Sequence, residues 1–109
     1  MNYVFDLDGT ICTDSKGDYR SAEPLVERIQ KVNRLFDEGN RIVIFTARGM
    51  GSTDNDVILA VHKWEEFTRS QLAEWGVKYH RLFLGKPAGD FYIDDKAICD
   101  SDFFKSVKP

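Results

Sequence analysis

Strand-like and helix-like segments alternate along this chain, and this alternation constrains its fold more than any other feature. Apolar residues recur at helical spacing over residues 25–36 and 57–75. Compact apolar runs predict four strands, at 3–5, 41–45, 79–84 and 91–93. Strands that alternate with helices of this length predict βαβ crossovers and a mainly parallel sheet. We therefore expect a doubly wound, Rossmann-like α/β fold, a three-layer sandwich with helices on both faces of the sheet.

Local signals mark the ends of these segments. Gly39 and Gly76 follow the two helical patterns as stop signals. Thr53 and Asp56 have the spacing of a capping box before the second helix. The β-branched run at 41–45 is typical of a strand that is buried on both faces.

Size and composition limit the function classes. With 109 residues we expect a single domain, residues 1–109. A net charge of −3 argues against nucleic acid as a general partner. Cys12 and Cys99 show no zinc or disulfide spacing, which indicates a reduced, cytoplasmic setting. Nothing approaches the roughly 18 apolar residues of a transmembrane helix, and we expect no membrane partner.

Polar side chains follow each predicted strand. In open parallel sheets, ligands bind outside the carboxyl ends of the strands, so these side chains are expected to converge at one edge. The first strand ends in two carboxylates two positions apart, with a glycine turn beneath them. Like charges held close repel unless a cation lies between them, and hard oxygen ligands suit Mg²⁺. The residues at the four strand ends are Asp6 and Asp8, Thr46 and Arg48, Lys86, and Asp94 with Asp95.

In this order the segments resemble the four motifs of haloacid dehalogenase superfamily phosphohydrolases. The first motif is Asp6-Leu7-Asp8-Gly9-Thr10, the second is Thr46 after an apolar strand, the third is Lys86 before a proline, and the fourth is Asp94-Asp95. The ordered set spans nearly the whole chain. The resemblance implies a Mg²⁺-dependent phosphatase that hydrolyses a phosphomonoester through an aspartyl-phosphate intermediate.

The resemblance also implies roles at the reacting phosphate. Asp6 would be the nucleophile, because the acyl phosphate that it forms is reactive enough for water to cleave. Asp8 would act as general acid and then as general base. Thr46 and Lys86 would stabilise the transferring group. Arg48 has a fork that suits phosphate, and it has an alternative in pairing with a nearby carboxylate.

The resemblance places the metal among the carboxylates. Asp94 would complete the Mg²⁺ shell with Asp6, and Asp95 would support it or hold a metal-bound water. Asp8 would contact the metal through its backbone carbonyl. Three of the four motifs also have a structural alternative, in which Asp8 is a turn residue, Lys86 is a surface lysine, and Asp94-Asp95 caps a short final helix.

Residues 11–22 have room only for a flap-like insertion, so the chain resembles the members without a cap domain. An open site suits a phosphate on a larger molecule, or a lid borrowed from a neighbouring subunit, and we therefore expect self-association. Similar small capless proteins are associated with sugar-phosphate metabolism, which makes a phosphorylated carbohydrate a candidate substrate. Candidate leaving-group contacts, besides Arg48, are Ser15, Lys16, Asp18, Tyr19, Arg20 and Met50.

Two other function classes compete. A receiver-type phosphoacceptor domain shares an early acidic pair and a lysine before proline, but it needs an acceptor aspartate where this chain has Phe45-Thr46. A phosphate-binding module that has lost catalysis would not need the complete set of reactive residues that this chain carries.

Overall fold

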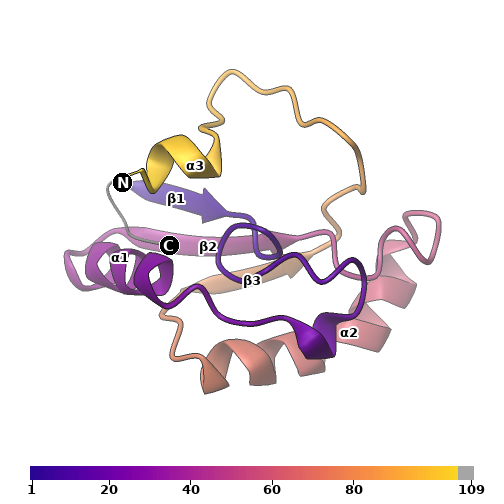
Figure 1. Ribbon diagram of the computed structural model, residues 1–109. Helices are drawn as coiled ribbons and strands as arrows, with labels where there is room; N and C mark the ends of the chain where they lie inside the picture. Colours follow the sequence, from indigo (N-terminus) through magenta and orange to yellow (C-terminus); the bar gives the residue numbers. More distant parts are fainter. Residues whose placement is uncertain (106–109) are drawn as a thin grey trace.

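The sheet has three parallel strands in the order β1-β2-β3 (Figure 1). The computed structural model describes residues 1–105. The strands are β1 (Asn2–Phe5), β2 (Arg41–Thr46) and β3 (Arg81–Leu84). In the register, Phe5 pairs with Ile44 and Thr46 pairs with Leu84. The carboxyl ends of all three strands therefore meet at one edge, and the predicted parallel α/β class is confirmed.

The helices follow the predicted periodicity. They are α1 (Val26–Asp37), α2 (Val57–Glu74) and α3 (Asp100–Phe103), and a 3-10 helix, η1, spans Tyr19–Ser21. The two predicted stop signals are confirmed, because Gly39 and Gly76 have φ of 96° and 70°, which suits glycine. The capping box is corrected in one respect. Asp56 is the N-cap of α2 and accepts the Leu59 N–H at 3.2 Å, whereas Thr53 bonds the Asp56 N–H one turn earlier. None of the helices described within residues 1–105 is long and apolar enough to cross a membrane.

One face of the sheet carries the core. Phe5, Ile44 and Leu82 belong to a buried cluster, and residues of α1, α2 and α3 join that same cluster. On the opposite face, Val4 and Phe83 are 64% and 44% exposed. Val43 and Phe45 of β2 are half-buried, so this strand is not covered on both faces as its composition predicted. The helices of the described chain gather on one face and leave the other open, whereas the sequence predicted a three-layer arrangement with helices on both faces.

The predicted strand at 91–93 is wrong. These residues lie in an extended segment that arches away from the sheet between β3 and α3 (Figure 1). We call residues 85–99 the arm. A strand parallel to its neighbours needs a crossover of a dozen or more residues, and only residues 85–90 separate β3 from this run. The run has strand composition, but its own chain cannot bring it into the sheet as a parallel strand.

Candidate active site

Asp6 follows the last residue of β1 at the carboxyl edge of the sheet. The Thr10 hydroxyl donates to Asp6 Oδ2 at 3.2 Å, and Lys86 Nζ lies 3.4 Å from Asp6 Oδ1. Gly9, with φ of 85°, turns the chain so that the N–H groups of residues 10–12 all reach the Leu7 carbonyl. This turn presents the Asp6 carboxylate beside a lysine ammonium, with 35% of its side chain open to solvent.

Thr46 and Lys86 come together from the ends of β2 and β3. The Lys86 N–H donates to the Thr46 carbonyl at 3.2 Å. Thr46 is fully buried, and its hydroxyl accepts the Arg48 N–H at 3.1 Å. The Lys86 ammonium also lies 4.2 Å from the centre of the Tyr92 ring. Residues of the first three predicted motifs thus meet at one edge, as the strand-end reasoning predicted.

Asp8 is bound to Arg48 through both carboxylate oxygens. Arg48 Nε donates to Oδ2 at 2.9 Å and Arg48 Nη2 donates to Oδ1 at 3.0 Å. The Arg48 side chain has no exposed area, and Asp8 is 19% exposed. A two-point pair of this kind fixes the direction of the carboxylate as well as its charge. The fork that suits phosphate is therefore engaged by a carboxylate, which favours the alternative weighed for Arg48.

Two further side chains hold Arg48 in place. Arg48 Nη1 donates to the Thr68 hydroxyl of α2 at 3.3 Å, and the guanidinium lies 4.8 Å from the centre of the Tyr19 ring. The Tyr19 hydroxyl accepts the Gly49 N–H at 2.9 Å. Sequence reasoning missed Thr68, because nothing in a helix periodicity shows which polar residue meets a distant loop. Tyr19 was predicted as a leaving-group contact, and the structure adds this contact with Arg48.

The remaining flap candidates do not form one surface. Arg20 lies over the rings of Trp64 and Phe67, and Met50 is buried. Lys16 and Asp18 are exposed, and the Ser15 hydroxyl is buried. The predicted insertion at 11–22 is a loop that contains η1, and isolated bridges join Cys12 to Asp8 and to Pro24.

Cys12 is a neighbour of the site rather than a nucleophile. The pKa of its thiol is raised to about 12, chiefly by burial and also by the nearby Asp8 carboxylate, while Arg48 acts in the opposite direction. The Cys12 thiol donates toward Asp8 Oδ1 at 3.5 Å. A thiol with so high a pKa carries almost no reactive thiolate at neutral pH.

Asp94 and Asp95 lie on the exposed arm, apart from Asp6. The Lys96 N–H donates to Asp94 Oδ1 at 3.1 Å, and this bond lowers the pKa of Asp94. Within residues 1–105, no group of three or more histidine, cysteine, aspartate or glutamate side chains is placed to hold a metal ion. Asp6 and Asp8 are present, but one described chain does not assemble the carboxylate set that the Mg²⁺ prediction requires.

The chain was compared with known proteins. No family model matches it, and no curated protein matches it. A crystal structure of a structural-genomics target from Vibrio cholerae is 31% identical, with a TM-score of 0.86, over 94% of this chain and 85% of that one. A D,D-heptose bisphosphate phosphatase from B. bronchiseptica, crystallised with magnesium and phosphate, is 19% identical, with a TM-score of 0.54, over 96% of this chain and 62% of that one. The second likeness shows a shared fold.

Proposed function

We propose that this chain, which belongs to the haloacid dehalogenase superfamily, is a phosphatase that hydrolyses a phosphomonoester at the carboxyl edge of its sheet. The observation that carries the proposal is that two pairs of charged side chains lie together at that edge. Asp6 lies beside the Lys86 ammonium, and Asp8 is held by Arg48. The fold shared with a phosphatase supports the same reaction class.

Asp6 is the group that attacks phosphorus. Its carboxylate oxygen forms a bond to phosphorus while the bond from phosphorus to the leaving oxygen breaks. The Lys86 ammonium, 3.4 Å from Asp6, neutralises charge on the transferring phosphoryl oxygens. The Thr46 hydroxyl keeps a proton to donate, because its hydrogen bond with the Arg48 N–H uses a lone pair of its oxygen. Thr46 is fully buried, so this contact requires the phosphate to enter the edge as far as the end of β2.

Asp8 transfers the protons. It gives a proton to the leaving oxygen, then takes one from the water that attacks phosphorus in the acyl phosphate, which releases phosphate and restores Asp6. Arg48 is a positioning residue, because its two bonds orient the Asp8 carboxylate. Mg²⁺ dependence is part of the proposal, and Asp6 would supply a hard oxygen ligand. Within the described residues, one chain does not assemble the other ligands.

The substrate is proposed to be a phosphate on a molecule large enough to cover an open site, and a phosphorylated carbohydrate is the first class to screen. No cap domain lies over the edge in the described residues, where the flap is the loop that contains η1. A sugar phosphate, a nucleotide and a phosphopeptide would separate the classes of leaving group.

The proposal is tested with p-nitrophenyl phosphate in the presence and absence of Mg²⁺. We expect hydrolysis by the unmodified protein and a loss of about 10³-fold or more in kcat for Asp6→Asn, because the nucleophile is removed. Asp14→Asn is the matched control, since Asp14 is an exposed carboxylate that bonds the Lys16 N–H. Full hydrolysis by Asp6→Asn would overturn the nucleophile assignment. An unmodified protein that binds phosphate but shows no turnover would favour the binding module.

A further inference from the structure

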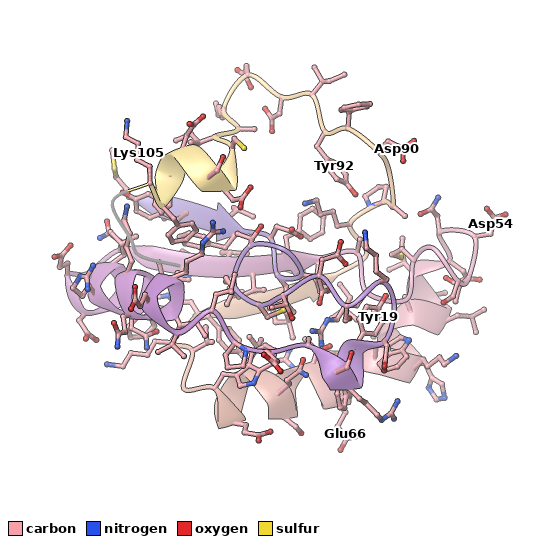
Figure 2. All side chains as sticks on the ribbon, viewed as in Figure 1. Tyr19, Asp54, Glu66, Asp90, Tyr92 and Lys105 are labelled. Carbon is pink, nitrogen blue, oxygen red and sulfur yellow. The ribbon has the colours of Figure 1, made fainter. Side chains whose placement is uncertain are left out.

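The arm is fixed at both ends and exposes apolar side chains between them. The Ala88 N–H donates to Asn55 Oδ1 at 3.0 Å, and beyond the arm Arg28 Nη1 donates to Asp100 Oδ2 at 2.7 Å. Figure 2 shows Tyr92 on the arm, on the part that rises above the sheet. Phe91 is 85% exposed and Ile93 is 98% exposed. Large apolar side chains held this far out of the core indicate a surface that meets another molecule.

The outer edge of β1 is a second surface that is open to another molecule. β1 pairs with β2 on one side, and no other strand of residues 1–105 pairs with it. Val4, near the middle of β1, is 64% exposed on the open face of the sheet. An unpaired edge of this kind is a template for a strand of another chain, and natural proteins usually cover or blunt it.

The arm fits this edge in length and in sequence. Phe91-Tyr92-Ile93 precedes Asp94 just as Tyr3-Val4-Phe5 precedes Asp6. Placed parallel to β1 and level with it, the segment brings Asp94 and Asp95 beside Asp6. Its own chain cannot make this pairing, because residues 85–90 are too short for a parallel crossover. An antiparallel pairing within the chain would carry Asp94 toward the opposite end of β1.

We infer that two copies of this chain exchange arms, each laying Phe91–Ile93 of its arm as a parallel strand on the free edge of the other copy's β1. The exchange is reciprocal, so one two-fold interface closes both edges. In this arrangement Asp94 and Asp95 of one copy join Asp6 of the other, and the proposed active site is built from two chains. This step rests on the proposed function, whereas the strand exchange itself does not.

The exchange also brings together the carboxylates of the proposed metal site, which a single chain leaves apart. Asp94 and Asp95 supply hard oxygen atoms, the ligand type that Mg²⁺ prefers, at the edge where Asp6 already lies. Exposed apolar residues of the arm become covered when the strand pairs, which favours association. The arm thus links the assembly of the protein to the assembly of its site.

The first experiment measures molar mass by size-exclusion chromatography with light scattering. We expect the unmodified protein to be a dimer and the variant Phe91→Asp/Ile93→Asp to be a monomer with an unchanged circular dichroism spectrum. Ile58→Asp on α2 is the matched control, because Ile58 is 81% exposed and lies outside the arm, so it should remain a dimer. A monomeric unmodified protein at its highest soluble concentration, or a dimeric arm variant, would overturn the inference.

The second experiment asks whether the site is shared. Asp6→Asn and Asp94→Asn are purified separately, partly unfolded together in urea, and refolded as a mixture. Half of the dimers should then be mixed, and each mixed dimer holds one intact site, so the mixture should recover about a quarter of the unmodified activity per chain. No recovery over the separate variants, when the unmodified protein is active, would overturn the shared site.

The two proposals fail in different ways. An unmodified protein that is dimeric through its arm but hydrolyses no phosphate overturns the proposed function and supports the exchange. An unmodified protein that hydrolyses phosphate as a monomer overturns the exchange and supports the proposed function. A disulfide between cysteines placed at Val4 and Tyr92, in a background where the exposed Cys99 is replaced by serine, gives a check that needs no activity, because the exchanged form brings these two positions together from different chains.

Discussion

At the scale of single residues, Arg48 shows how burial decides between two roles for the same side chain. Its guanidinium suits phosphate and carboxylate equally well. The Arg48 guanidinium makes two hydrogen bonds to Asp8 and its side chain has no exposed area, so it is not free to bind a substrate phosphate. The structure therefore favours a role in orienting the proposed acid and base, and this role predicts a specific pattern of losses.

Arg48→Met should lower the free energy of unfolding by about 3 kcal/mol, because the Asp8 carboxylate then lacks its buried partner. Arg69→Met is the matched control. The pair between Arg69 and Glu65 is exposed, so its loss should cost no more than about 0.5 kcal/mol. Urea unfolding followed by circular dichroism measures both changes, and equal losses would contradict the assignment.

The kinetic effect of Arg48 separates positioning from mere stability. Arg48→Lys keeps the charge but cannot make both bonds, so we expect kcat to fall while KM stays nearly constant. The pH profile of kcat should also move, since the group that holds the Asp8 carboxylate has changed. A variant that loses stability with an unchanged kcat and pH profile would make Arg48 a structural residue only.

The two cysteines are expected to differ sharply in reactivity. The pKa of Cys12 is raised to about 12 by burial, whereas Cys99 is exposed. With a disulfide reagent at pH 8, Cys99 should react quickly, and Cys12 should react at a useful rate only after unfolding, because the thiolate is the reacting form. Absorbance of the released thiol measures the two phases. Reaction of both thiols at one rate in the folded protein would contradict the buried placement of Cys12.

At the scale of elements, the loop between β2 and α2 depends on Gly49. Its φ is 78°, and a Cβ there would lie 2.7 Å from Trp64 Cδ1 and 3.1 Å from Ala60 Cβ. Gly49→Ala should therefore lower the free energy of unfolding by about 2 kcal/mol, through strain at positive φ and through the close contacts. Gly51→Ala should change it by less than about 1 kcal/mol, since no atom lies within 4 Å of a Cβ there. Comparable losses would contradict the packing of this loop.

The elements also show which features can be predicted from sequence. Residues 26–37 and 57–74 are helical because apolar residues at helical spacing form one buried face, which is a local property. The run at 91–93 has equally good strand composition, but a strand needs a neighbour, and the connection to β3 is too short to provide one. Strand composition is local, whereas strand pairing is not.

The same distinction applies to the candidate site. The meeting of Asp6, Thr46 and Lys86 follows from where parallel strands end, so the order of elements predicts it. The contact of Arg48 with Thr68 depends on how α2 packs over the loop, and no spacing in the sequence shows it. Asp94 and Asp95 stay a prediction as metal ligands, because the described chain leaves them exposed.

At the scale of the whole molecule, stability should be unevenly distributed. β2 lies between two strands, and Ile42, Ile44 and Thr46 have no exposed area. The arm is exposed along most of its length and lies outside the sheet (Figure 1). Amides that open only on global unfolding belong to elements like β2, and amides in segments like the arm exchange in the native state. A single described chain therefore contains a rigid sheet and an arm with little protection of its own.

Hydrogen exchange of the unmodified protein and of the monomeric variant Phe91→Asp/Ile93→Asp turns this contrast into a test of the assembly. In the variant, amides of residues 87–99 should exchange fastest and those of β2 slowest. In the unmodified protein, exchange of residues 91–95 should slow as protein concentration rises, because strand pairing between copies protects backbone N–H groups and follows mass action. Exchange in α2, far from the edge, should be the same in both proteins and serves as the internal control. If residues 91–95 exchange equally fast in both proteins at every concentration, the arm does not pair, and the carboxylates it carries must reach Asp6 by another route.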